Sequence, residues 1–123
     1  MLKISSLIKS FSHALRGVVI LFRTEQSFRL QAVVAVVVLF FCVWLPLRIS
    51  EIIVVLLLVG SVLILETINS IFERLVDTFK PRLHPIVGEI KDIMAAAVFL
   101  VSVLAAVIGL IIFLPHFWRL LSL

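Results

Sequence analysis

The chain has 123 residues, of which 63% are hydrophobic, and its mean hydropathy is +1.33. A soluble domain of this length has too much surface to hide so many apolar side chains, so the composition excludes an ordinary soluble protein. The net charge of +4 comes from cations interleaved with apolar runs, which indicates a membrane rather than a nucleic-acid partner. The single cysteine, Cys42, excludes a disulfide framework and a cysteine-based metal site. We expect one all-α membrane domain, 1–123.

Residues 3–28 are predicted to form an amphipathic helix on the membrane surface. Apolar side chains recur there at helical spacing, and Lys9, Arg16 and Arg23 repeat along another face. This pattern is typical of a helix in the headgroup region, with its cations toward anionic lipid. A cytosolic helix packed on a partner is the alternative. The stretch lacks the apolar core and cleavage site of a signal peptide, so we expect it to be retained.

Three membrane helices are predicted over residues 30–47, 51–79 and 92–117. The first is apolar throughout and ends at Pro46, which disfavours helix in the residue before it. The apolar part of the second is too short to cross alone, so its helix must continue through Glu66 towards Phe79. Pro81 and Pro85 then favour a polar loop, 80–92.

The cations are distributed unequally between the two sides that three spans would create. One side holds the N-terminus and the 80–92 loop, and the other holds the turn near residue 48 and the C-terminus. Nine of the eleven cations fall on the first side: Lys3, Lys9, Arg16, Arg23, Arg29, Arg74, Lys80, Arg82 and Lys91. This bias predicts that the first side is cytoplasmic.

Glu66, Asn69, Glu73 and Asp77 share one face of the second predicted span, because their spacing follows the helical repeat. Charged groups at membrane depth are costly unless they meet protein, water or a cation. The starts of the other spans add Glu25 with Arg29, and Lys91 with Asp92. A hard cation such as Mg²⁺, arriving with phosphates, would relieve the repulsion between these carboxylates. The alternative is an ion-pair network that only holds the helices together.

Three segments resemble motifs of the prokaryotic diacylglycerol kinase and undecaprenol kinase family. Residues 66–77 read E-T-I-N-S-I-F-E-R-L-V-D and resemble the family's E-x-x-N-[ST]-x-x-E-x-x-V-D. Residues 91–98 read K-D-I-M-A-A-A-V and are similar to K-D-x-x-[AS]-[AG]-A-V. Residues 25–29 read E-Q-S-F-R and are similar to E-x-[AN]-F-R. Order, spacing and membrane placement match over about residues 9 to 115.

The resemblance implies a homotrimeric membrane lipid kinase that transfers phosphate from Mg-ATP to a lipid hydroxyl in the bacterial inner membrane. It implies that Glu66 is the general base and that Glu25 and Glu73 bind Mg²⁺. The implied nucleotide contacts are His13, Glu25, Glu73, Arg82, His84, Lys91 and Asp92. The implied lipid contacts are Arg29, Asn69 and Ala95.

The identity of the lipid alcohol stays open between undecaprenol and diacylglycerol. Diacylglycerol-specific members of the family carry Tyr where His13 stands and Gly-Ser where Met94 and Ala95 stand. Ala95 and the His84-Pro85 pair look more like the undecaprenol branch. A non-enzymatic membrane assembly subunit or a small transporter is the alternative function. A transporter would place its acidic residue near the bilayer midplane, whereas these acids gather towards one face.

Overall fold

A computed structural model describes residues 3–79 and 85–122. Within these residues the chain forms four helices: α1 (Ile4–Thr24), α2 (Gln26–Trp44), α3 (Ile49–Phe79) and α4 (Ile86–Leu121). The described part contains no strand, which confirms the expected all-α class.

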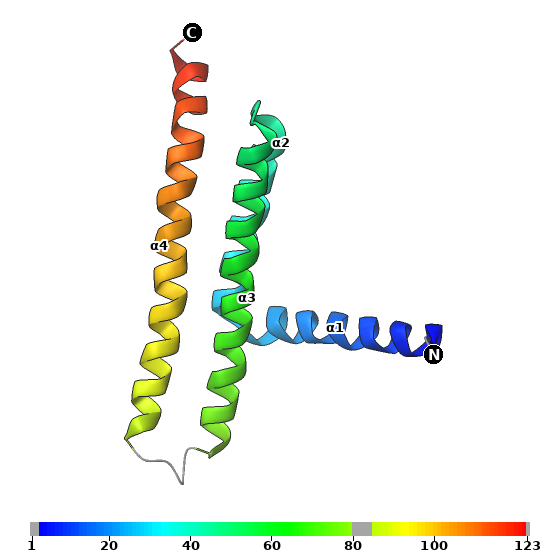
Figure 1. Cartoon of the computed structure of the whole chain (residues 1–123). Coiled ribbons are helices and arrows are strands. Elements are labelled where there is room, and N and C mark those ends of the chain that lie inside the picture. The colour runs from blue at the N-terminus through cyan, green and yellow to red at the C-terminus, as the bar shows by residue number, and fades with distance from the viewer. Residues whose placement is uncertain (1–2, 80–84, 123) are drawn as a thin grey trace.

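Helices α2, α3 and α4 lie side by side, and α1 runs across their direction from one end of α2 (Figure 1). Helix α3 packs against both α2 and α4, while α1 packs against α2. The far end of α3 and the start of α4 lie on the same side of the unit as α1 (Figure 1). The fold therefore gathers, at one end, the three segments that carry the sequence motifs.

The junction of α1 and α2, which we call the elbow, differs from the prediction. Helix α1 ends at Thr24 rather than at 28, because Glu25 adopts an extended conformation with φ −113° and ψ 106°. The Nη1 atom of Arg29 donates to the carbonyl oxygens of Phe22 (2.8 Å) and Arg23 (3.3 Å). These bonds satisfy carbonyls that the end of a helix leaves without partners. The second helix consequently begins at Gln26 instead of 30.

The other helix ends follow proline and capping chemistry. Helix α2 stops at Trp44 rather than at 47, and Leu45, which precedes Pro46, is extended. Helix α3 begins at Ile49 instead of 51 and ends at Phe79 as predicted. Helix α4 begins at Ile86 rather than at 92 and runs to Leu121 instead of 117. Residues 86–92 of the predicted loop are therefore helical, since a proline such as Pro85 is well tolerated where a helix starts.

The core of the unit is small. Its buried cluster consists of Cys42, Val55 and Ile112, near the end where α2 turns into α3. Helix α1 buries no residue, and α4 buries only Ile112. Each of the four helices is long and apolar enough to cross a membrane, by length and composition alone. The three predicted spans are therefore long and apolar enough to cross a membrane. These two properties alone do not distinguish α1 from α2, α3 and α4.

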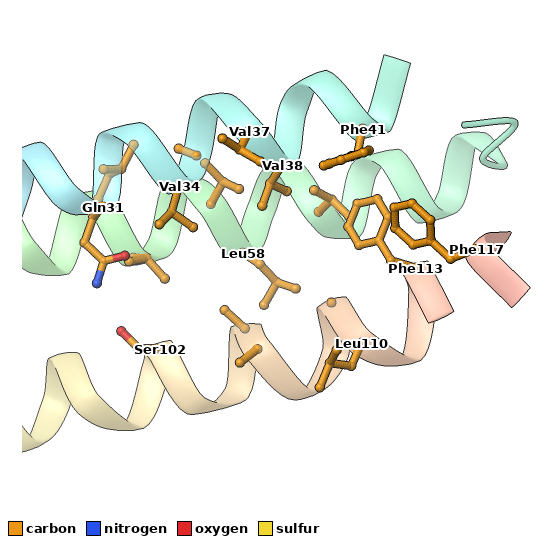
Figure 2. Close-up of a pocket in the computed structure, with 18 residues that line it drawn as sticks. Gln31, Val34, Val37, Val38, Phe41, Leu58, Ser102, Leu110, Phe113 and Phe117 are labelled. Carbon is orange, nitrogen blue, oxygen red and sulfur yellow. The ribbon is translucent and has the colours of Figure 1, made fainter. Parts of the chain in front are cut away.

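A cavity of about 530 Å³ lies between α2, α3 and α4. Its lining is almost entirely apolar, and small residues of α4 such as Ala105, Ala106 and Gly109 contribute to it. Figure 2 shows Gln31 of α2 and Ser102 of α4 facing each other across this space. The hydroxyl of Ser102 is buried and has no hydrogen-bond partner among the described residues. The helices of one chain thus leave an apolar space open between α2 and α4.

Candidate active site

The polar face of α3, formed by Glu66, Asn69, Glu73 and Asp77, descends from the interior of the unit towards its α1 end. Glu66 is only 8% exposed, and Asp77 at the other end of the face is exposed. Between them, the side-chain amide of Asn69 donates to Oε1 of Glu73 over 3.3 Å. The spacing seen in the sequence therefore produces a graded face, in which the deepest carboxylate is buried and the outermost one meets solvent.

The elbow brings Glu25 to this face. Ser70, one turn after Glu66 on α3, is 4% exposed, and its hydroxyl donates to Oε1 of Glu25 over 2.9 Å. The Nη2 atom of Arg74 lies 3.5 Å from the same Oε1 and donates to Oγ1 of Thr24 over 2.7 Å. Because Glu25 is extended while its neighbours are helical, its side chain can reach α3 at the point where α1 turns away.

Glu25, Glu66 and Glu73 form an acidic cluster, since the charges of Glu25 and Glu73 both act on Glu66. Three carboxylates in one place repel one another unless a cation or a proton intervenes. Among the described residues, no group of three or more His, Cys, Asp or Glu side chains has the geometry to hold a metal ion. Mg²⁺ needs no such group, because it is usually held by one or two carboxylates together with substrate phosphates. The oxygen donors of Glu25 and Glu73 fit that chemistry.

The start of α4 joins the outer part of the polar face through Lys91. Its Nζ atom lies 2.7 Å from Oδ1 of Asp77, and its charge also interacts with Glu73. Both members of the pair are partly exposed, so the contact itself adds little to stability. What the pair does is place a cation beside the carboxylates at the solvent end of the site.

The remaining predicted site residues are less tightly connected. Asp92 and Ala95 are exposed on α4, and His13 is exposed on α1. Within the described residues, His13 has no hydrogen bond or ion pair with the polar face. Arg29 uses Nη1 to cap α1. The predicted nucleotide contacts Arg82 and His84 lie outside the described residues.

Ser70, Thr24 and Arg74 touch the site, although sequence reasoning gave them no role. Ser70 and Arg74 follow Glu66 at successive intervals of four residues, which is the signal that could have found them. At the opposite end of the unit, Nε2 of His116 lies 3.3 Å from Oε1 of Glu51. This contact ties the end of α4 to the start of α3.

The arrangement is suited to moving a proton from a group that arrives through the membrane. Glu66 is a buried carboxylate at the inner end of the face, where a proton acceptor is shielded from water. The outer carboxylates and Lys91 offer oxygen donors and a positive charge where a phosphate with its cation would enter from solvent. A proton acceptor and a phosphate-binding end thus lie along one helix.

The sequence of this chain is similar to sequences of known proteins. The prokaryotic diacylglycerol kinase family matches residues 12–113 of this chain. An undecaprenol kinase from Bacillus subtilis is 37% identical over 113 residues, which cover 92% of each chain. A diacylglycerol kinase from Synechocystis is 32% identical and covers 89% of this chain and 63% of its own. A diacylglycerol kinase from Escherichia coli is 26% identical, with 90% of this chain and 91% of its own covered.

The family match spans most of the chain and includes the elbow, the whole polar face of α3 and the start of α4. The 37% identical relative matches nearly the full length of both proteins. The chain therefore belongs to the prokaryotic diacylglycerol kinase family.

Proposed function

We propose that this protein is an ATP-dependent lipid kinase that phosphorylates the hydroxyl of a membrane lipid alcohol, with a long polyprenol such as undecaprenol as its substrate. The observation that carries the proposal is the buried carboxylate of Glu66 within an acidic cluster on apolar helices. Membership of the family supports the kinase activity. No feature of the comparisons supports a transporter or an assembly subunit.

Glu66 is the general base in this proposal. A lipid hydroxyl is confined to the headgroup plane, and a carboxylate on a helix just below that plane can accept its proton as the oxygen attacks phosphorus. Its burial keeps bulk water away from the reacting oxygen. Phosphoryl transfer itself depends mostly on positioning and charge neutralisation.

Glu25 and Glu73 would hold Mg²⁺, which when bound neutralises charge on the transferring phosphate. Their hard oxygen donors suit that ion better than a softer metal. Lys91 and Asp92 would contact the nucleotide, together with His13, Arg82 and His84. Arg29, Asn69 and Ala95 would contact the lipid. Lys91 already lies at the solvent end of the carboxylates, which supports its part in this assignment.

The membrane arrangement is part of the proposal. We place α1 on the cytoplasmic surface of a bacterial inner membrane and let α2, α3 and α4 cross it. The crosswise direction of α1 in Figure 1 and its repeating cations support this placement. The sparse burial of α4 supports assembly with further copies, and a homotrimer is the state that we propose.

The choice of lipid follows the relative with 37% identity, which is an undecaprenol kinase. The diacylglycerol kinases of Synechocystis and Escherichia coli are 32% and 26% identical to this chain. The apolar lining of the cavity between α2, α3 and α4 is compatible with either hydrocarbon chain. Diacylglycerol is therefore the second candidate, and only a direct comparison of the two alcohols separates them.

The substitution Glu66→Gln tests the proposed base. It should lower the rate of lipid phosphorylation by about 10²–10⁴-fold, because the amide cannot take the proton. Binding of Mg-ATP and the assembly in detergent should persist, since a neutral side chain of similar shape removes a buried charge. Activity and nucleotide binding should be measured on the same preparation.

The matched control is Glu89→Gln, the same change at an exposed position in the first turn of α4, which should leave turnover near the original value. Unchanged turnover in Glu66→Gln would overturn the assignment of the base. Loss of the folded assembly in that variant would instead assign Glu66 to holding the helices together. A complete lack of transfer by the unmodified protein, to any lipid alcohol, would overturn the function itself.

A further inference from the structure

Arg74 lies next to the acidic cluster and is outside the set of residues to which a role has been given. It stands on α3 one turn beyond Ser70, so both side chains project towards the elbow. Its side chain is 51% exposed, while that of Glu25 beside it is 24% exposed. The guanidinium group of Arg74 therefore faces Glu25, whose carboxylate the proposed function assigns to Mg²⁺ binding.

The contacts of Arg74 form a continuous path across the elbow. Its Nη2 atom donates to Oγ1 of Thr24, and that hydroxyl in turn donates to the carbonyl of Ile20 in the last turn of α1. The same Nη2 atom lies 3.5 Å from Oε1 of Glu25. Arg74 therefore connects α3 both to the end of α1 and to the residue that separates α1 from α2.

These contacts restrict one oxygen of Glu25. Oε1 accepts the hydrogen bond from Ser70 and faces Arg74, and neither contact engages Oε2. A carboxylate held through one oxygen presents the other oxygen in a fixed direction. Hydrogen-bonding partners orient the ligands of known metal sites in the same way. Without Arg74, Glu25 would keep one side-chain partner from α3, and the elbow would lose its connection through Thr24.

We propose that Arg74 is a positioning residue, which fixes the elbow and thereby directs the carboxylate of Glu25 towards the cation of the nucleotide. This inference rests on the proposed function for the identity of that cation. It assigns to Arg74 no contact with substrate. It predicts that the loss of Arg74 weakens metal binding rather than the chemical step.

The test compares Arg74→Met, Arg74→Lys and the unmodified protein in detergent. Arg74→Met should raise the Mg²⁺ concentration needed for half-maximal rate by about 10- to 100-fold, the usual effect of losing a partner of a metal ligand. The kcat at saturating Mg²⁺ should stay within a few-fold of the original value. Arg74→Lys should restore most of the Mg²⁺ dependence, because both contacts use a single nitrogen that an ammonium can replace.

Two measurements do not depend on turnover. Binding of Mn²⁺ in the presence of ATP, followed by electron paramagnetic resonance, should weaken in Arg74→Met in parallel with the Mg²⁺ dependence. Amide hydrogen exchange at Glu25, whose N–H bonds to the carbonyl of Leu21, should become faster. The control Arg119→Met makes the same charge change at the other end of the unit and should alter neither quantity.

The possible outcomes separate this inference from the proposed function. Unchanged Mn²⁺ binding in Arg74→Met would overturn the inference, and tighter binding would show that Arg74 only repels the cation. If Arg74→Met fails to fold, Thr24→Val removes the accepting hydroxyl and should shift Mn²⁺ binding in the same direction by less. An inactive unmodified protein would overturn the proposed function, while the exchange measurement would still decide whether Arg74 fixes the elbow.

Discussion

The carboxylates of the polar face differ in burial although they lie on one helix. Glu66 is buried, Glu73 is half-buried and Asp77 is exposed. A carboxylate in an apolar environment either pairs with a nearby opposite charge or becomes neutral by binding a proton. A buried carboxylate is suited to exchanging a proton with a lipid hydroxyl, and exposed ones are suited to a hydrated cation with its phosphates. Burial thus supports different roles for Glu66 and Glu73.

Glu73→Gln should abolish Mg²⁺-dependent phosphorylation. The loss should exceed the about 10- to 100-fold typical of an outer-shell partner, because Glu73 is assigned as a direct ligand. Glutamine keeps an oxygen that can accept the hydrogen bond from Asn69, so the helix should stay intact. Titrating the rate with Mg²⁺ measures the effect.

The outcome is compared with Glu89→Gln, which removes an equal charge from an exposed site on α4. Near-normal turnover and an unchanged Mg²⁺ titration in Glu73→Gln would show that Glu73 does not bind the metal. The carboxylate of Glu73 would then serve a structural role through its hydrogen bond with Asn69.

At the scale of elements, the helical repeat predicted the polar face of α3 and its end at Phe79. Those features depend on residues close in sequence. The elbow depends on side chains that are far apart along the chain, such as Ser70 and Glu25. Helical periodicity does not detect such contacts, and for this reason the first helix was predicted to run to 28 instead of ending at Thr24. Pro85 was interpreted as part of a loop, whereas the structure uses it to begin α4.

The contact between Glu51 and His116 should hold the end of α4 to the start of α3. Glu51 also accepts a hydrogen bond from the main-chain N–H of Arg48 (2.9 Å), as carboxylates at the third helical position do. Glu51→Ala and His116→Phe should each lower the midpoint of unfolding in detergent. Because the two side chains share one contact, the effect of either change should shrink when the other is already present.

A double-mutant cycle of these two positions measures that coupling. Lipid phosphorylation should persist in both variants, because the pair lies at the other end of the unit from the acidic cluster. Fully additive effects on the midpoint would show that the two side chains do not interact. Loss of activity in a variant that remains folded would show that this end of the unit influences the site.

At the scale of the whole molecule, one chain covers little of its own apolar surface. Large apolar side chains are exposed on every helix, and the space between α2 and α4 stays open. Composition predicted a membrane protein for this reason, but it could not indicate how α1 turns away from α2. Lipid, together with the neighbouring copies of the proposed homotrimer, would cover this surface.

The most direct test of the account is phosphoryl transfer from labelled Mg-ATP by the unmodified protein in mixed micelles. Undecaprenol and diacylglycerol should be offered side by side, with no other lipid alcohol present. We predict that label is transferred to undecaprenol, and at a faster rate than to diacylglycerol. A faster rate with diacylglycerol would contradict the choice of lipid, and no label in either alcohol would contradict the central claim that this protein is a lipid kinase.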